Sequence, residues 1–333
     1  MSLPRFEYLT PSTLSEALSL TAKGAAFVSG GTDLFVRMKE RLCLPKRLIG
    51  LGDVEELRGI KSLPNGDLRI GAATTLTDLA DAFSAIPGGE GLRDAVCLTA
   101  SPLLRNSGTV GGNLCQESRC TYYNQPPIFR KHWPLCFKLG GNLCHVVKGG
   151  KTCYAVYSGD LAGTLMALKA KVAVAGPRGT RDVDLGNFFT GSGIRPTVME
   201  PDEILVEVCI TKLPSFFGFS YQKLRLRDTI DFPLLGISLF MEFDSPKDGR
   251  QCTDARFVLN AAGPSPLIIP EAEAQFKGRV VTEEMAVEAG LLVQKMAKPV
   301  ANTASSPRYR KAMIPVLTRR ALQSALEQTI PIR

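Results

Sequence analysis

The sequence of 333 residues lacks any long apolar run. No stretch approaches the roughly 20 apolar residues that cross a bilayer, so no transmembrane helix is predicted. The N-terminus, MSLPRFEYLTPSTLSEAL, also lacks the basic segment followed by an apolar one that is typical of a secretory signal. We therefore expect a cytoplasmic protein with no membrane partner.

The charge pattern lacks the features of a nucleic-acid-binding protein. The formal net charge is +8, but the basic residues are spread along the chain, and few aromatic residues lie between them. The excess of positive charge favours an acidic partner of another kind and does not identify it. We expect no nucleic-acid partner.

The length exceeds what one compact core usually serves, so two or three domains are expected. Strand-like and helix-like segments succeed one another throughout, which is typical of an α+β protein. The predicted ranges are 1–55, a βαβ unit, then 56–215, a middle domain, and 216–333, a C-terminal α+β domain.

Several elements are predicted from local patterns. Strands are expected at Phe6–Leu9 and Leu68–Gly71. The first helix has two candidate caps, Thr10 before Pro11 or the box formed by Thr13 and Glu16. Further along the chain, helices are expected from about Thr77, at Glu283–Lys295 and at about Pro307–Glu327.

Two glycine turns stand out, although the Rossmann pattern G-x-G-x-x-G and the P-loop pattern are both missing. FVSGGTDL (27–34) places Gly30 and Gly31 between an apolar strand and a helix start. GTVGGN (108–113) is a second turn with two adjacent glycines. Glycines without Cβ atoms let an anion approach bare backbone amides. Each turn alone could be an ordinary turn. Together they suit a ligand with a pyrophosphate and a second polar stretch, such as FAD.

Four of the nine cysteines fall within residues 119–154, called here the cysteine loop: Cys120, Cys136, Cys144 and Cys153. The gaps between them are 15, 7 and 8 residues. Structural zinc usually binds short C-x₂₋₄-C pairs, whereas a 4Fe–4S cluster takes four thiolates from separated positions. The spacing favours the cluster and leaves zinc and unligated thiols open. His132 and His145, in the same loop, are interpreted as surface residues or neighbours of the site.

The motifs VSGGTDL, TVGGNL, SGDLAGTLMAL and PDEIL, in this order, resemble the FAD-binding medium subunits of the molybdenum hydroxylases, the xanthine dehydrogenase family. The resemblance covers essentially the whole chain. It implies the three-domain, PCMH-type α+β fold with an inserted iron–sulfur loop and a C-terminal flavoprotein domain. The cysteine loop further resembles that of the 4-hydroxybenzoyl-CoA reductase β subunits.

The resemblance also implies a set of site residues. Cys120, Cys136, Cys144 and Cys153 would hold a 4Fe–4S cluster, with Cys115 as a nearby thiol that could compete with Cys120. Asp160 has a structural alternative, the N-cap of the helix that follows it. The implied FAD-binding residues are Phe27, Val28, Ser29, Gly30, Gly31, Thr32, Asp33, Leu34, Ala100, Thr109, Gly111, Gly112, Asn113, Asp160, Leu205 and Lys223.

By resemblance, the chain is an electron-transfer subunit with no catalytic residue of its own. Its implied partners are a large subunit that binds the molybdenum cofactor and a small 2Fe–2S subunit, in an (αβγ)2 assembly. An acidic electron carrier such as ferredoxin would supply electrons for the reductive dehydroxylation of 4-hydroxybenzoyl-CoA. Three alternatives remain: another molybdenum hydroxylase, a stand-alone NAD(P)H:flavin reductase, and a zinc-stabilised binding module without redox function.

Overall fold

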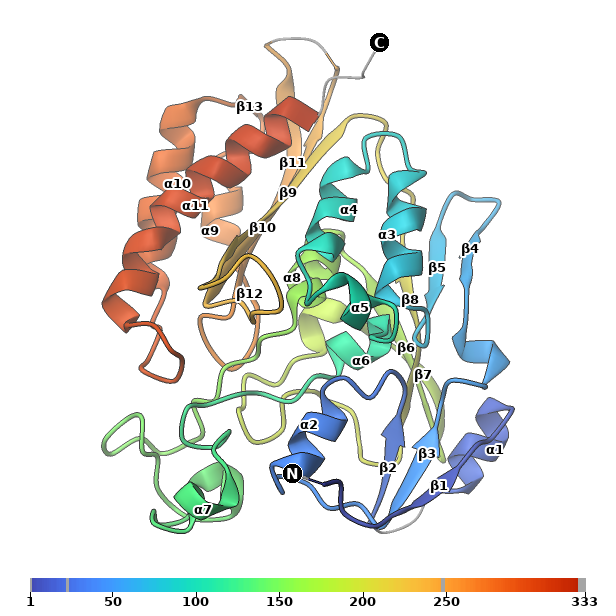
Figure 1. The fold of residues 1–333 in the computed structure, drawn as a ribbon. Coiled ribbons are helices and arrows are strands. Elements are labelled where there is room, and N and C mark those ends of the chain that lie inside the picture. The colour runs from blue at the N-terminus through green and yellow to red at the C-terminus, as the bar shows by residue number, and fades with distance from the viewer. Residues whose placement is uncertain (1, 22–23, 247–248, 329–333) are drawn as a thin grey trace.

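The computed structural model describes residues 2–21, 24–246 and 249–328, arranged around three β-sheets (Figure 1). The outermost parts of the first and last predicted ranges, residue 1 and residues 329–333, lie outside the described residues. Each of the three predicted ranges contains one of the sheets. Among the described residues, none of the helices combines the length and apolar character needed to cross a membrane.

The first sheet is small and parallel, with strand order β1-β3-β2. Thr13 caps its first helix by accepting from the Glu16 amide at 3.1 Å, so the predicted box and not Thr10 forms the cap. The elements are β1 (Glu7–Leu9), α1 (Leu14–Ser19), β2 (Ala25–Val28), α2 (Leu34–Lys39) and β3 (Arg47–Gly50).

The second sheet has five antiparallel strands in the order β4-β5-β8-β6-β7. Its strands are β4 (Ile60–Ser62), β5 (Leu68–Gly71), β6 (Lys171–Gly176), β7 (Gly179–Asp184) and β8 (Ile204–Ile210). The associated helices are η1 (Glu55–Leu57), α3 (Leu76–Ser84), α4 (Glu90–Cys97), α5 (Pro102–Arg105), α6 (Val110–Leu114), α8 (Asp160–Ala167) and η3 (Leu185–Asn187).

The third sheet follows the path β12-β11-β10-β9, with β13 paired to β11, and α10 and α11 cover one of its faces (Figure 1). Its strands are β9 (Phe217–Leu224), β10 (Leu235–Phe243), β11 (Gln251–Asn260), β12 (Leu267–Ile268) and β13 (Arg279–Val280). The helices are α9 (Pro270–Glu273), α10 (Glu283–Met296) and α11 (Pro307–Gln328).

The middle and C-terminal ranges share one hydrophobic core. α8 is buried along its whole length, and Phe219, Phe240 and Val258 of the third sheet belong to the same buried cluster as α8 and the middle sheet. The shared cluster follows from the composition of α8, because a helix that is apolar on all sides must be covered on all sides. The two ranges therefore pack as one body at this point.

The cysteine loop is mostly irregular and extends from one corner of the molecule (Figure 1). It contains only two short helical turns, α7 (Pro127–Arg130) and η2 (Phe137–Leu139). A two-hydrogen-bond bridge between Arg119 and Val156, each bond 2.7 Å long, closes its base. The loop thus has the irregular backbone that its glycine, proline and lysine content predicts.

Candidate functional site

A cavity of about 510 Å³ lies where the two glycine turns meet, and we call it the glycine cavity. This volume is within the usual range for small-molecule sites. The cavity brings together thirteen of the sixteen residues predicted to bind FAD: Phe27, Val28, Ser29, Gly30, Gly31, Thr32, Asp33, Leu34, Ala100, Thr109, Gly112, Asn113 and Asp160.

The two glycine turns touch each other at Gly30. The hydroxyl of Ser107 donates to the Gly30 carbonyl at 2.9 Å, and a Cβ at Gly30 would overlap the carbonyl oxygen of Ser107. Gly31 adopts φ +68, in the region that favours glycine. Glycine is therefore required at 30 by close approach and at 31 by backbone conformation.

At the other end of the cavity, Asp160 forms a buried ion pair. Its carboxylate accepts from the Lys223 ammonium at 3.0 Å and from the Tyr221 hydroxyl at 2.7 Å. Burial raises the pKa of Asp160, and the Lys223 charge and the Tyr221 hydrogen bond oppose that rise. Lys223 also donates to the Leu98 carbonyl at 2.9 Å. The pair fixes the start of α8 against β9.

The alternative role of Asp160 as an N-cap is wrong. The cap residue of α8 is Gly159, and Asp160 is the first residue of the helix, with its side chain on Tyr221 and Lys223. An acidic residue in the first turn of a helix is still favoured by the helix dipole. The sequence alone does not show whether Gly159 or Asp160 is the cap, because the cap is defined by the backbone angles of the residue before the helix.

Three of the predicted FAD-binding residues do not line the glycine cavity. A Cβ at Gly111 would meet Ala72, so Gly111 serves the packing of α6 on the middle sheet. Leu205 lies in β8, 3% exposed, within the shared core. Lys223 reaches the cavity through its ion pair with Asp160.

Polar groups without a protein partner line the glycine cavity. Thr99 Oγ1 and Gln116 Oε1 are both buried and unpaired. The Nε atoms of Arg37 and Arg119 are also unpaired, although each guanidinium contacts a carboxylate, Glu117 and Asp33 respectively. Buried polar groups are normally satisfied, so these four atoms indicate a polar ligand that supplies the missing hydrogen bonds. None of these four residues was among those predicted to bind FAD.

Two residues with unusual backbone angles lie next to each other in the wall of this cavity. Ala100 and Ile230 have φ +53 and +62, and the Ile230 amide donates to the Ala100 carbonyl at 3.1 Å. A β-branched residue at positive φ is strained, and such strain concentrates at functional sites. The neighbouring Phe232 ring also lines the cavity and lies 3.9 Å from the Arg119 guanidinium.

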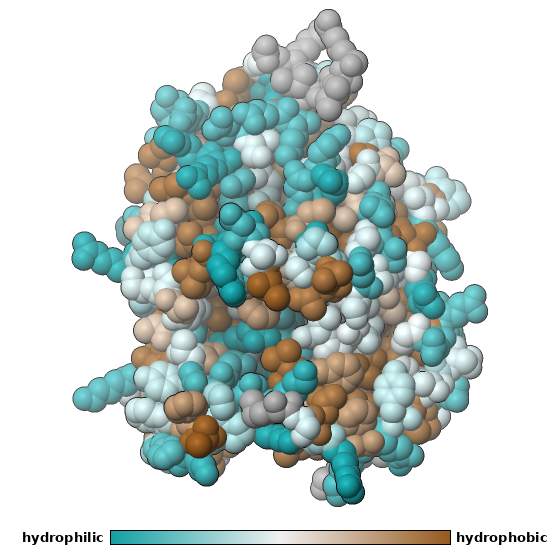
Figure 2. Space-filling view, viewed as in Figure 1, coloured by the Kyte–Doolittle hydropathy of each residue, from teal (hydrophilic) through white to brown (hydrophobic). Residues whose placement is uncertain are grey.

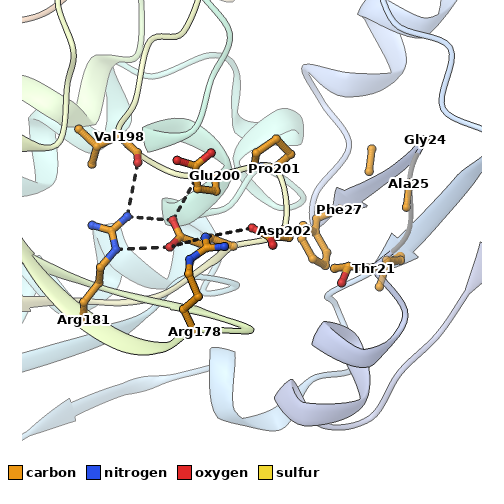
Figure 3. A pocket seen from close by; sticks show the side chains of 13 residues that line it. Thr21, Gly24, Ala25, Phe27, Arg178, Arg181, Val198, Glu200, Pro201 and Asp202 are labelled. Carbon is orange, nitrogen blue, oxygen red and sulfur yellow. Dashed lines mark hydrogen bonds and ion pairs between the residues drawn. The ribbon is translucent and has the colours of Figure 1, made fainter.

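A second cavity, of about 860 Å³, also has Phe27 in its wall (Figure 3). Its walls include the edge strand β2, the β6–β7 hairpin and the turn before β8. Arg181 donates to Glu203 at 2.8 Å, and Arg178 donates to Asp202 at 3.3 Å. Phe27 therefore places the second cavity next to the glycine cavity.

The four cysteines of the cysteine loop line a single third cavity, called the cysteine cavity. Its remaining walls are mainly aromatic and aliphatic side chains. Apart from the thiols and the tyrosines, His145 and Lys138 are its titratable side chains. Backbone amides approach two of the sulfurs: Val147 N lies 3.5 Å from Cys144 Sγ, and Ala155 N lies 3.4 Å from Cys153 Sγ. The fold thus brings together four thiols that are far apart in sequence.

Burial raises the pKa of the Cys120 and Cys153 thiols, and backbone N–H groups act in the opposite direction at both. At Cys153 the Lys138 charge also opposes the rise. Within the described part of the chain, no three His, Cys, Asp or Glu side chains lie close enough together to hold one metal ion.

Cys115 is separate from this set. Its sulfur lies 3.6 Å from Met199 Sδ, and the residue lines the glycine cavity rather than the cysteine cavity. Of the two histidines, His145 stacks on Tyr122, with ring centroids 5.1 Å apart, and it lines the cysteine cavity. His132 is exposed and contacts the Ile128 carbonyl.

Comparison with known families identifies the class of protein. Residues 4–213 match the FAD-binding domain in molybdopterin dehydrogenase, and residues 219–325 match the CO dehydrogenase flavoprotein C-terminal domain. The chain therefore belongs to the family of FAD-binding subunits of molybdopterin dehydrogenases, and it is an oxidoreductase subunit. The predicted family and the predicted fold class are both confirmed.

Individual relatives agree with this assignment. The carbon monoxide dehydrogenase medium chain of Hydrogenophaga pseudoflava is 27% identical over 97% of each chain. The aldehyde oxidoreductase FAD-binding subunit of Escherichia coli K12 is 33% identical over 81% of this chain and 85% of its own. A solved carbon monoxide dehydrogenase from Hydrogenophaga pseudoflava superimposes with a TM-score of 0.79 at 26% identity, covering 99% of this chain and 100% of that one.

Proposed function

We propose that this chain is the FAD- and 4Fe–4S-carrying electron-transfer subunit of a molybdenum-containing reductase. The observation that supports it most is the cysteine cavity, in which the four thiols of the cysteine loop converge. The matched family description names FAD and no iron–sulfur cluster, so the cluster depends on that cavity and on the resemblance of the loop. Both cofactors supply one chemistry, the uptake and release of electrons.

The FAD would be held by the glycine cavity. Bare amides at Gly30 and Gly31, with the Arg37 and Arg119 guanidinium groups, suit the two negative charges of a diphosphate. Thr99 and Gln116 would donate to or accept from the polar parts of the same ligand. The second cavity beyond Phe27 would receive one end of the dinucleotide, close to the Leu205 segment of β8.

The cluster would be held by Cys120, Cys136, Cys144 and Cys153. Four thiolates are the usual ligand set of a 4Fe–4S cluster, and amide hydrogen bonds to the sulfurs, like those at Cys144 and Cys153, are among the features that set its potential. In such a cluster each thiolate binds a different iron. Four thiols spread around one cavity therefore suit a cluster better than they suit a single metal ion, which needs its ligands close together.

We propose that the partners are a molybdenum-binding large subunit and a 2Fe–2S small subunit in an (αβγ)2 assembly, with a ferredoxin-like carrier as donor. The proposed overall reaction is the conversion of 4-hydroxybenzoyl-CoA to benzoyl-CoA, in which two electrons and two protons are taken up and water is released. The substrate would bind on the large subunit, so no residue of this chain is proposed to touch it.

The composition of the anaerobically purified complex tests this proposal. We expect one FAD and about four irons per copy of this chain beyond those of the partner subunits, by the four-thiolate ligation. Cys136→Ser should lose the additional irons and retain FAD, whereas Cys97→Ser, in α4, should lose neither. Full iron content in Cys136→Ser would refute the ligand assignment.

Substrate and direction are tested separately. With reduced ferredoxin as donor, the complex should reduce 4-hydroxybenzoyl-CoA, and Cys136→Ser should abolish that activity. The names of the relatives favour a second candidate, an oxidising hydroxylase whose electrons leave through FAD. Oxidation of a purine or an aldehyde with an artificial acceptor, and no dehydroxylation, would support that candidate. Zinc without iron would support the non-redox module, and turnover of NAD(P)H without a partner would support a flavin reductase.

A further inference from the structure

Lys138 differs from the other basic side chains of the cysteine loop. Its side chain is 3% exposed and lines the cysteine cavity, whereas Lys131, Lys148 and Lys151 are exposed. An ammonium group loses much solvation on burial and is retained there only with several close partners. Lys138 is therefore a fixed charge beside the thiols, and the exposed lysines are mobile charges in solvent.

The contacts of Lys138 fix the ammonium in one position. Nζ donates to Glu117 Oε1 at 2.7 Å, to Ser118 Oγ at 2.8 Å and to the Gly193 carbonyl. The Tyr123 ring lies 5.1 Å from Nζ. Three acceptors account for the three donors of the ammonium, so its geometry is fully determined.

Glu117 joins this lysine to the glycine cavity. Its second carboxylate oxygen accepts from Arg37 Nη2 at 3.3 Å, and Arg37 lines the glycine cavity. Burial lowers the pKa of Arg37, but the nearby charges of Glu117, Cys43, Tyr123 and Asp33 together outweigh that effect, and the net pKa is raised. One carboxylate thus lies between two cations, one at each cavity.

We propose that Lys138 and Glu117 set the reduction potential of the group bound in the cysteine cavity, with opposite signs. This inference rests on the proposed cluster. Reduction adds negative charge at the cavity, so a fixed cation lining it stabilises the reduced state and raises the potential. Glu117, further from the cavity, lowers it. Because both groups are mostly removed from water, their fields are weakly screened.

Redox titration of the intact complex, followed by the paramagnetic resonance signal of the cluster, tests this inference. Lys138→Met should lower the cluster potential by about 59 mV or more, equivalent to a tenfold change in a one-electron equilibrium. Glu117→Gln should raise it, and Lys138→Arg should leave it near the wild-type value. A purely structural role predicts no such opposite shifts.

Lys148→Met is the matched control, because it removes the same charge from the same loop at an exposed position. Its potential should stay close to that of the wild type. A shift in Lys138→Met no larger than in this control, at full iron content, would overturn the inference, as would shifts of equal sign in the lysine and glutamate variants. If Lys138→Met loses iron, the Glu117→Gln variant decides the question. The inference is then overturned if the cluster potential of Glu117→Gln does not rise above that of the wild type. Absence of iron from the wild-type chain would instead refute the proposed function.

Discussion

The side-chain amide of Asn302 donates to the carbonyl of Tyr154 at 2.6 Å, and the backbone carbonyl of Asn302 accepts from the Thr121 amide at 3.1 Å. Tyr154 follows Cys153, and Thr121 follows Cys120. One buried residue of the C-terminal range therefore holds the two ends of the cysteine loop, each beside a thiol. The spacing of two of the four thiols is therefore set by a residue far away in the sequence.

Asn302→Ala should loosen that spacing. Unpaired buried groups cost about 1–3 kcal/mol each, so the loop ends should separate more easily. We expect a lower iron content per chain with unchanged FAD, measured on anaerobically purified complex. Asn142→Ala, at an exposed position of the same loop, is the control and should keep its iron. Equal iron in both variants would contradict the role given to Asn302.

Arg310→Met should destabilise the fold. Arg310 is completely buried, and its guanidinium donates to the carbonyls of Leu234, Val300 and Ala261 and to the side chain of Asn302. Burial lowers its pKa to about 10. Leaving these acceptors unpaired should cost about 3 kcal/mol or more.

Thermal unfolding of the purified protein measures the effect of Arg310→Met. We expect a clear decrease in the midpoint temperature, and the exposed Arg308→Met should match the wild type. A midpoint for Arg310→Met within a degree of that control would show that the buried guanidinium is dispensable.

Gly30→Ala should weaken FAD binding. The added Cβ would overlap the Ser107 carbonyl, and forced repacking costs about 1–3 kcal/mol, so affinity should fall roughly tenfold. Iron content should not change. Gly52→Ala is a suitable control, because nothing lies within 4 Å of its Cβ position. Flavin release on dilution, followed by fluorescence, measures the affinity of both variants. Equal flavin release from Gly30→Ala and Gly52→Ala would count against close contact between the two turns.

Lys223→Met should make stability depend on pH. Without the ammonium, Asp160 is a buried carboxyl whose pKa lies above that in the unfolded chain, about 3.9. The folded state then binds the proton more tightly, so stability is lost as pH rises from the unfolded pKa through the folded one. The deficit relative to wild type should approach about 3–5 kcal/mol once Asp160 is ionised.

Thermal midpoints of Lys223→Met and wild type at pH 4.5 and pH 8 test this dependence. The difference between the two proteins should be smaller at pH 4.5. Asp160→Asn combined with Lys223→Met should remove the pH dependence, since no buried carboxyl remains. A deficit that grows on acidification would have the wrong sign.

Local patterns in the sequence predicted many elements well. The strand at Leu68–Gly71 has its predicted ends, and the helix expected from about Thr77 begins at Leu76, capped by Thr75. The turn at 27–34 was found because two glycines between an apolar strand and a helix start form a pattern within one short segment, although the contact that requires Gly30 comes from the distant Ser107. Such signals are local and can be read from short segments.

Local patterns did not predict the contacts between segments that are distant in the sequence. Thr99, Gln116 and Arg119 line the glycine cavity only because α4, α6 and the cysteine loop converge there. The sequence likewise offered no sign that Asn302 would tie the loop ends together. The shared core of the middle and C-terminal ranges was missed too, since α8 is apolar on all sides and its covering strands come later in the chain.

The tie formed by Asn302 bears on how this subunit could be transplanted or redesigned. A graft of residues 119–154 into a relative would transfer all four thiols and leave behind the asparagine and the buried arginine that orient it. A recipient would need the segment around 300–310 as well. The minimal portable module is therefore discontinuous, and it spans two halves of the polypeptide.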